Sequence, residues 1–468
     1  MLKNKNFIKI AVSLVFILAL SFALGSLANA TTYYVSTDGS DSNSGLSGNP
    51  WLTIQKAANT MSAGDTVHVQ AGTYEEAVTI ARSGSDGSPI TYKAEGTVTI
   101  TEPWTVGSYS TARHYITIDG FTFSGVRLYT RGDYTIIQNC AFEGPKGGLF
   151  ISMHPTVDPP SANCTVRGNT FQNFGTGSEL VIMTTGTNTS NILIENNLWK
   201  DNLGDAIRMF GTGHIFRNNT VDNLYVGGTA HADIFQIYDN NAEQSNNMLI
   251  EKNLFKDSPA SICMLLNGGA NPEVNQSNWT FRNNVWVNVG GVAQFTIPYC
   301  KFYNNTFINS GKNTAGPIMM RAYGETTYAY AHHTIVKNNI FIGCSSYPDS
   351  DKYGWYHFAD QSREYFTDFE GDYNYVSKSA AGGYLPKSGF SETHGINGGD
   401  PKFVNYDAYE FDLAGNSPLI GAGTPIAGFT DDKDGISRGV MWDIGAYEHV
   451  SEVQSNIPNP PSNLKVEQ

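Results

Sequence analysis

Several residues that can carry acid–base chemistry lie between positions 205 and 238. His231 and Asp233 stand two apart in a stretch with no other charged side chain, and Asp205 and Arg208 lie shortly before them. An imidazole can give or take a proton near neutral pH, and a guanidinium binds carboxylates through paired hydrogen bonds. Together, such groups could remove a proton from a carbon next to a carboxylate.

A β-elimination of this kind needs a positive group that neutralises the substrate carboxylate, a base, and an acid for the leaving oxygen. Arg208 could neutralise the carboxylate, or a calcium ion could do so if Asp205 and Asp233 held it, since calcium prefers oxygen ligands. On neighbouring strands these two carboxylates would lie roughly 5 Å apart, a spacing that also suits hydrolysis.

The base and the acid have candidates as well. His231 or Lys256 could act as the base, and Tyr238 could act as the acid. Both base candidates have a structural alternative, because a His-x-Asp pair is typical of a loop hydrogen bond and Lys256 could form an ion pair with Asp222 in the neighbouring repeat.

An internal repeat must position these residues. Each copy has an apolar residue, two variable residues, an Asn, one more residue and a large apolar residue. Phe121 and Cys140 replace the Asn in the first two copies, and successive key positions are 19 to 34 residues apart. The nine copies are Ile118–Phe123, Ile137–Phe142, Val166–Phe171, Ile194–Trp199, Phe216–Val221, Ile250–Phe255, Phe281–Trp286, Phe302–Phe307 and Val336–Phe341.

A second recurring position follows each copy of the repeat. Two residues after the large apolar position stands a Gly, Asn or Asp, the types that tolerate left-handed turns. A short stretch of alternating apolar residues comes next, so strand, turn, strand and turn repeat in each copy. This pattern predicts an all-β parallel β-helix whose coils bury their apolar faces by stacking. We expect the Asn column to be structural, with amides hydrogen-bonded between coils. Cys164 and Cys300, five coils apart, should then not form a disulfide.

The same register predicts one outward column on the strand after the turn. We align Val181, Arg208, Gln236, Cys263, Gln294 and Met319 in that column, with Phe210, Tyr238 and Thr296 two residues further along the same face. Polar and aromatic side chains together suit sugar recognition. We expect a substrate to contact Gln236, Phe210, Gln294 and Arg321.

Five stretches resemble secreted right-handed parallel β-helix proteins of the pectate-lyase-like superfamily. Tyr33–Ser42, Pro50–Ala58 and Ala63–Glu75 are similar to their opening, which family 9 polysaccharide lyases share, and Asp432–Arg438 with Asp443–Glu448 resembles their end. The resemblance implies the right-handed fold. The Asp-rich calcium stretch that ends in a catalytic Lys in family 9 lyases has no counterpart here. Apolar residues at helical spacing over Thr53–Met61 predict a short helix that caps the first coil.

The ends of the chain and its charge limit the possible partners. Residues 1–30 have a basic start, an apolar run and an Ala-x-Ala site, so they predict a signal peptide and a secreted or cell-surface protein. Its removal would change the net charge from −14 to −17, which disfavours nucleic acid. We expect a β-helix domain over residues 31–450, a linker and tail over 451–468, no further membrane span, and a monomer.

The sequence thus predicts a protein that acts on an extracellular polysaccharide, as a lyase on an acidic, uronate-containing glycan. A glycoside hydrolase or a C5-epimerase on the same scaffold is an alternative. A non-catalytic carbohydrate-binding or adhesion protein is another.

Overall fold

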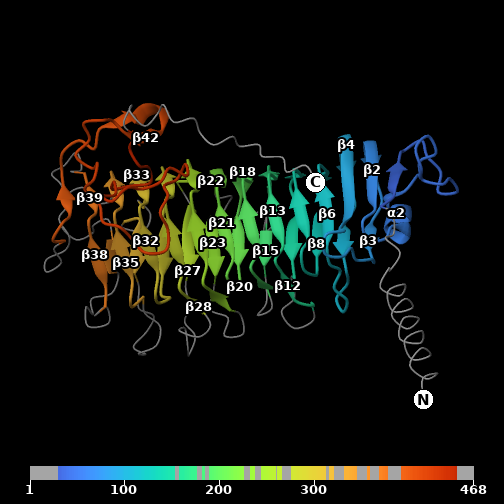
Figure 1. Ribbon diagram of the computed structural model, residues 1–468, viewed down its shortest axis with the longest axis horizontal. Helices are drawn as coiled ribbons and strands as arrows, with labels where there is room; N and C mark the ends of the chain where they lie inside the picture. Colours follow the sequence, from blue (N-terminus) through green and yellow to red (C-terminus); the bar gives the residue numbers. More distant parts are fainter. Residues whose placement is uncertain are drawn as a thin grey trace, which may run out of the picture.

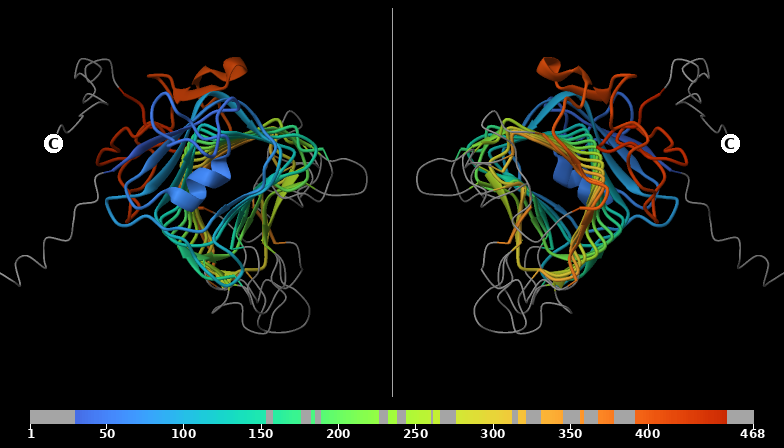
Figure 2. Two further views of the ribbon diagram at one scale, coloured as in Figure 1. Left: turned by 90° about the vertical axis from the view of Figure 1, so that its right-hand side faces the viewer. Right: turned by 90° about the vertical axis from the view of Figure 1, so that its left-hand side faces the viewer.

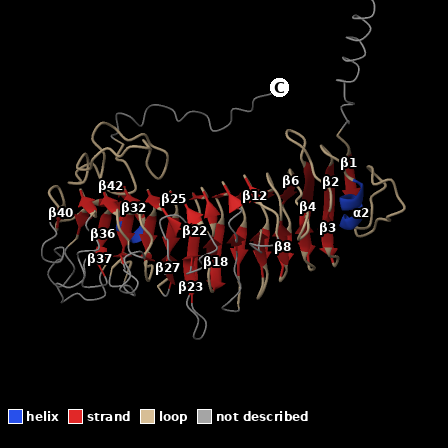
Figure 3. Cartoon of the chain, turned by 90° about the horizontal axis from the view of Figure 1, so that it is seen from below, coloured by secondary structure: helices blue, strands red, loops and turns tan. Residues whose placement is uncertain are grey.

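The computed structural model describes residues 30–152, 158–175, 182–184, 189–225, 232–237, 244–259, 261–265, 276–311, 316–320, 331–344, 356–358, 368–377 and 392–450. Almost all of the predicted signal peptide and the whole predicted tail lie outside these ranges. Within them the chain winds into a right-handed parallel β-helix whose coils follow one another along the long axis (Figures 1 and 3). The predicted fold class is confirmed.

Three rows of strands form the walls, and Figure 2 shows them around a common interior. Face A is an 11-stranded parallel sheet. Its strands are β3 (Val78–Ile80), β5 (Trp104–Val106), β8 (Arg127–Thr130), β11 (Gly148–Ile151), β15 (Ile182–Thr184), β19 (Ile207–Met209), β23 (Ala232–Ile237), β27 (Ser261–Leu265), β31 (Ala293–Phe295), β34 (Ile318–Met320) and β37 (Tyr356–Phe358).

Faces B and C belong to one 24-stranded sheet, because β4 pairs with both β6 and β7. Face B comprises β1 (Thr32–Val35), β2 (Thr66–Tyr74), β4 (Ile90–Ile100), β6 (Ile116–Asp119), β9 (Ile136–Gln138), β13 (Thr165–Arg167), β17 (Leu193–Glu195), β21 (Ile215–Arg217), β25 (Leu249–Glu251), β29 (Thr280–Arg282), β32 (Lys301–Tyr303), β35 (Ile335–Lys337) and β38 (Glu370–Asp372). Face C comprises β7 (Thr122–Ser124), β10 (Ala141–Glu143), β14 (Thr170–Gln172), β18 (Leu198–Leu203), β22 (Thr220–Tyr225), β26 (Leu254–Lys256), β30 (Val285–Val287), β33 (Thr306–Ile308), β36 (Ile340–Ile342), β39 (Tyr375–Val376) and β40 (Ile396–Asn397).

Smaller elements complete the fold. Short strands between faces A and B form a five-stranded sheet, namely β12 (Ser161–Ala162), β16 (Thr189–Ser190), β20 (Gly211–Thr212), β24 (Ser245–Asn246) and β28 (Gln276–Ser277). The antiparallel pair β41 (Phe403–Asn405) and β42 (Glu410–Leu413) flanks a 3-10 turn, η2 (Tyr406–Ala408). The helix α2 (Ile54–Thr60) forms where it was predicted, buries Ile54, Ala57 and Ala58, and lies at the N-terminal end of the stack (Figure 2). Its role as a cap stays a prediction. In the described ranges no helix has the length and apolarity that crossing a membrane requires.

The Asn column lies between faces B and C and is structural, as predicted. Each Asn Nδ2 donates to the Oδ1 of the Asn in the next coil, over 2.9 to 3.2 Å. The ladder residues are Asn169, Asn197, Asn219, Asn253, Asn284, Asn305, Asn339 and Asn374. The last amide donates to Glu392 Oε1 at 2.8 Å, so a carboxylate ends the ladder.

The turn column adopts the conformation that its residue types suggest. All nine predicted positions have φ between 47° and 105°, the left-handed region. They are Gly125, Gly144, Asn173, Asp201, Asn223, Asp257, Asn288, Asn309 and Gly343. Large apolar side chains stack inside, and the rings of Phe142 and Phe171 lie 4.9 Å apart. Cys164 and Cys300 are buried and unpaired, as expected.

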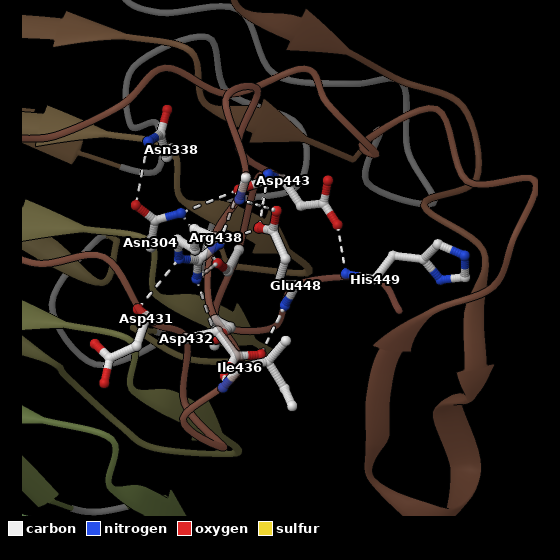
Figure 4. A network of polar contacts seen from close by, with 12 residues as sticks. Asn304, Asn338, Asp431, Asp432, Ile436, Arg438, Asp443, Glu448 and His449 are labelled. Atoms are coloured by element: carbon white, nitrogen blue, oxygen red, sulfur yellow. Dashed lines mark hydrogen bonds and ion pairs between the residues drawn. The ribbon is translucent and has the colours of Figure 1, made fainter. Parts of the chain in front are cut away.

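The C-terminal strap, residues 400–450, packs over later coils (Figure 1). Figure 4 shows the network that holds it, centred on Arg438. The buried Arg438 side chain pairs with Glu448 at 2.9 Å and donates to Asn283 Oδ1 at 3.0 Å. The carboxylate of Asp432 accepts the backbone N–H of Ile436 at 2.7 Å. The closing motif of the sequence is therefore a bracing segment on the coils.

Candidate functional site

Face A carries one outward column that runs past Arg208. The strand register pairs Arg208 with Gln236, and Gln294 with Met319, so these four predicted positions are confirmed. The full run through the middle of the sheet is Tyr129, Phe150, Met183, Arg208, Gln236, Met264, Gln294 and Met319.

Two positions of the predicted column are wrong. Met183, and not Val181, pairs with Arg208, and Met264, and not Cys263, pairs with Gln236. The second error has a local cause, because the pairing of β23 with β27 shifts between Asp233 and Gln236. An irregularity of this kind adds a residue to one strand, so a fixed offset from the turn places the next side chain on the wrong face.

Arg208, which is partly exposed, and the largely buried Asp205 form an ion pair at the outer part of the site. The guanidinium Nη2 lies 3.5 Å from Asp205 Oδ2, and the two side chains are 26% and 10% exposed. This contact is longer than the roughly 2.7–2.9 Å of a tight charge-assisted hydrogen bond. A carboxylate on a bound substrate could therefore compete with Asp205 for the guanidinium.

Asp233 lies behind Asp205, in the next coil. Its backbone N–H donates to Asp205 Oδ1 at 3.1 Å, as the predicted equivalence of the two positions requires. Its side chain is fully buried, and its Oδ2 accepts from Gln236 Nε2 at 3.0 Å. Gln236 is itself only 7% exposed. Asp233 and Gln236 therefore support Asp205 and Arg208 from within the wall.

This arrangement offers calcium no preformed site. Three of the four oxygens of Asp205 and Asp233 already accept hydrogen bonds, and the cationic Arg208 is adjacent. Calcium takes about six to eight oxygen ligands, yet in the described part of the chain no three His, Cys, Asp or Glu residues gather as a metal site would require. Calcium stays a prediction, and no chemical step is derived through it.

Phe210 does not face a substrate, contrary to the sequence prediction. Its side chain is fully buried in the hydrophobic core. The reason is that β19 ends at Met209, so the alternation of a strand no longer applies one residue later. The backbone carbonyl of Phe210 accepts from the buried ring of His214 at 2.8 Å, which fixes this corner of the coil.

Lys256 also fails to join the site. It lies at the end of β26 on face C and forms an ion pair with Asp222 at 3.1 Å. The structural alternative for Lys256 is therefore confirmed. Gln294, by contrast, is half-buried in the outward column, two strands beyond Gln236.

Three predicted site residues, His231, Tyr238 and Arg321, lie outside the described residues. In the sequence His231 directly precedes β23 and Tyr238 directly follows it. Their predicted roles as base and acid stay predictions, as does the contact of Arg321 with substrate.

An aromatic group at the start of the column was missed. The rings of Tyr129 and Phe150 stack at 5.4 Å, and the guanidinium of Arg127 lies 5.0 Å from the centre of the Phe150 ring. The signal was present, since Arg127–Thr130 and Gly148–Ile151 follow the turn glycines Gly125 and Gly144. Extending the outward column toward the N-terminus would have found both rings.

The first part of the chain matches a known family. Residues 33–190 match the family model described as the Pel9A-like, right-handed β-helix region. The resemblance to pectate-lyase-like β-helix proteins is thereby confirmed for that segment. An uncharacterized protein of Bacillus subtilis (strain 168), YwoF, is 36% identical over 104 residues, which are 20% of this chain and 22% of that protein. The match thus spans about a fifth of this curated relative.

Several solved structures are similar to this chain at low sequence identity. The pectate lyase Pel9A is 16% identical, with 90% of this chain and 98% of that chain covered and a TM-score of 0.48. A rhamnogalacturonan lyase is 16% identical, covering 66% and 87%, with a TM-score of 0.45. A lacto-N-biosidase from Eubacterium ramulus is 11% identical, covering 79% and 72%, with a TM-score of 0.43.

Proposed function

We propose that the protein is a secreted polysaccharide lyase that cleaves a uronate-containing glycan by β-elimination on face A. The observation that carries the proposal is the position of Arg208. A half-buried guanidinium stands in the middle of an outward column, with Asp205 Oδ2 3.5 Å away. No other cation of the described residues occupies that column between Tyr129 and Met319.

The chemistry follows from charge. When a uronate carboxylate replaces Asp205 at Arg208, the guanidinium stabilises the negative charge that develops as the neighbouring C–H loses its proton. The buried Asp233 and Gln236 hold Asp205, and through it they orient Arg208. We assign the base to His231 and the acid to Tyr238, because the two residues flank β23 in the sequence.

The aromatic group supports a substrate that lies along the helix axis. Tyr129 is three strands from Arg208, which is about 14 Å at the usual strand spacing. An aromatic ring can stack on the apolar face of a sugar while the guanidinium holds a carboxylate further along. Tyr129 therefore offers a second contact for the same glycan.

Hydrolysis by Asp205 and Asp233 is less well supported. A pair of catalytic carboxylates must reach the scissile bond from both sides, yet Asp233 is fully buried and accepts a hydrogen bond from Gln236. A C5-epimerase would begin with the same proton removal, so its product separates it from a lyase. A non-catalytic binding protein would bind without changing the glycan.

The test is to incubate the mature protein with polygalacturonate, rhamnogalacturonan, alginate and glucuronan. A lyase produces ultraviolet absorbance from the new double bond, whereas an epimerase alters only the proton NMR spectrum of the polymer. We expect Arg208→Gln to lower kcat/KM by about 100- to 1000-fold, as removal of a group that stabilises transition-state charge does. The matched control is Arg217→Gln, which removes an equal charge on face B, where Arg217 pairs with Glu195 at 3.0 Å.

The control should retain full activity. Binding without double bonds, new reducing ends or epimerised units on any of the four polymers would leave the binding protein as the correct class. Full lyase activity in Arg208→Gln would show that the reaction takes place on another part of the molecule.

A further inference from the structure

A pocket of about 340 Å³ lies on face B, under the C-terminal strap and away from the Arg208 column of face A. This volume is at the lower end of the range for small-molecule sites, about 300–1,000 Å³. The side chains used in the argument come from two neighbouring strands and the strap: Thr280, Arg282, Lys301, Tyr303, Ala427 and Phe429.

One of the two cations of the pocket is already neutralised. Arg282 pairs with the buried Glu251 at 2.6 Å and donates to the carbonyl of Gly428 at 3.2 Å. Its guanidinium also lies 4.6 Å from the centre of the Phe429 ring. Arg282 therefore ties the strap to the coil and has little charge to offer a ligand.

Lys301 is different, because within the described ranges it has no ion pair with a carboxylate. Its Nζ donates to the side-chain oxygen of Asn278, a neutral partner. Other lysines of these coils do have acidic partners, such as Lys252 with Asp431 at 2.6 Å and Lys256 with Asp222 at 3.1 Å. Burial lowers the pKa of Lys301, so the charge is partly desolvated in the pocket, and among the described residues no carboxylate forms an ion pair with it.

Neutral hydrogen-bonding groups surround this cation. Thr280 and Tyr303, which carry hydroxyls, line the pocket together with Asn247 and Asn278. Burial raises the pKa of Tyr303 to about 12, so the phenol remains protonated and can donate a hydrogen bond at neutral pH. One unpaired positive charge among hydroxyls and amides matches a ligand with one negative charge and several hydroxyls.

We infer that this pocket binds the carboxylate of a single acidic sugar residue, with Lys301 holding the carboxylate and Thr280 and Tyr303 holding ring hydroxyls. A phosphate would carry more charge than one lysine compensates, and a neutral sugar would leave Lys301 unpaired. The inference does not depend on lyase activity, because Arg208 is on face A. It describes an accessory site that would hold an acidic glycan or its product.

The test measures binding of monosaccharides to the full-length mature protein by isothermal titration calorimetry. The probes are galacturonate, glucuronate, galactose and inorganic phosphate. We expect at least one of the two uronates to bind, galactose to bind at least about tenfold more weakly, and Lys301→Gln to weaken uronate binding about 10- to 100-fold, the usual effect of losing a hydrogen bond to a charged group.

Three further variants separate charge from structure and this pocket from face A. Lys200→Gln removes an equal charge from an exposed position on β18 of face C and should leave binding unchanged. Arg208→Gln should also leave it unchanged, whether or not it affects cleavage of a polymer. Ala427→Trp, at an exposed residue of the strap, should block the pocket without disturbing the coil.

Equal uronate affinity in the wild type and Lys301→Gln would overturn the inference, provided that both proteins unfold at the same temperature. So would galactose binding as tight as that of the uronates, or no uronate binding at all. Phosphate binding tighter than uronate binding would also overturn it and would point to a simple anion site.

Discussion

Asn253→Ala tests how much the Asn ladder contributes to stability. The Asn253 side chain is fully buried, and its Oδ1 accepts from Asn219 N at 2.8 Å and from Asn219 Nδ2 at 3.2 Å. The substitution leaves both donors buried without their acceptor. Each unsatisfied buried donor costs about 1–3 kcal/mol, so we expect the free energy of unfolding to fall by about 2–6 kcal/mol.

The end of the ladder provides an internal comparison. Asn169 Oδ1 accepts from only one described donor, Cys140 N at 2.9 Å. By the same reasoning Asn169→Ala should cost about 1–3 kcal/mol, half as much as the substitution in the middle. Asn49→Ala is the matched control, because Asn49 is exposed and outside the ladder, and such surface changes stay within about 0.5 kcal/mol.

The assay is denaturant unfolding followed by tryptophan fluorescence, with the midpoints compared at a common slope, because solenoids can unfold in more than one step. Trp199 and Trp286 are buried inside the coils and report on this region. If the free energy of unfolding falls no more in Asn253→Ala than in Asn169→Ala, the cost does not depend on the number of buried donors that lose their acceptor, and the reasoning is refuted. A loss no larger than in Asn49→Ala would show that the ladder is not important for stability.

Three other predictions follow from buried groups. Arg438→Met should cost about 3–5 kcal/mol, because it leaves Glu448 charged, buried and unpaired; the measurement is the unfolding midpoint together with protease cleavage within the strap, and unchanged values would contradict the bracing role. Burial lowers the pKa of His214 to about 4; since unfolded His takes up a proton near pH 6.5, stability should be complete above that pH and fall as the pH drops toward 4, and His214→Gln should flatten this dependence in pH-resolved unfolding. Burial raises three thiol pKa values to about 12, so at pH 8 a thiol reagent should label them only after denaturation, and rapid labelling in the native protein would contradict their burial. These thiols belong to Cys140, Cys164 and Cys300.

The repeating part of the fold was predictable because each repeated position has one dominant physical requirement that few residue types meet. The turn column needs positive φ, which Gly, Asn and Asp tolerate, and the ladder needs an amide that donates and accepts at once. The last ladder position predicted from the sequence is Asn339, although Asn374 adds another between β38 and β39. The copy was missed because Gly371-Asp-Tyr-Asn-Tyr-Val376 has Gly in place of the first apolar residue.

The candidate site was only partly predictable, since it depends on where strands end and where pairing shifts. The position of Arg208 and the stacking of Asp205 with Asp233 follow from constant offsets within a coil. Phe210 and Cys263 were misplaced because β19 ends early and the β23–β27 pairing is irregular. The repeat pattern does not show where a strand ends or where its pairing shifts, because side-chain packing at each corner determines both.

Function in this scaffold must come from side chains that the repeat does not use. The outward column of face B alternates in charge, and its members neutralise one another across coils, as Arg217 does with Glu195 and Arg282 with Glu251. Because the strand register places opposite charges next to each other, these ion pairs stabilise the column, and the charges that a ligand would meet there largely cancel. Lys301 stands outside that alternation, one strand beyond Arg282, and its side-chain partner among the described residues is the amide of Asn278.

The outward column of face A differs, because charges of opposite sign do not alternate along it. In this column the strand register places two uncharged residues, Met183 and Gln236, on either side of Arg208. One described partner of Arg208 lies in its own coil, namely Asp205, three residues earlier and 3.5 Å away. In a chain with 43 acidic and 29 basic side chains, we propose that this cation on face A is what attracts an anionic substrate, and Arg208→Gln is the substitution that tests it.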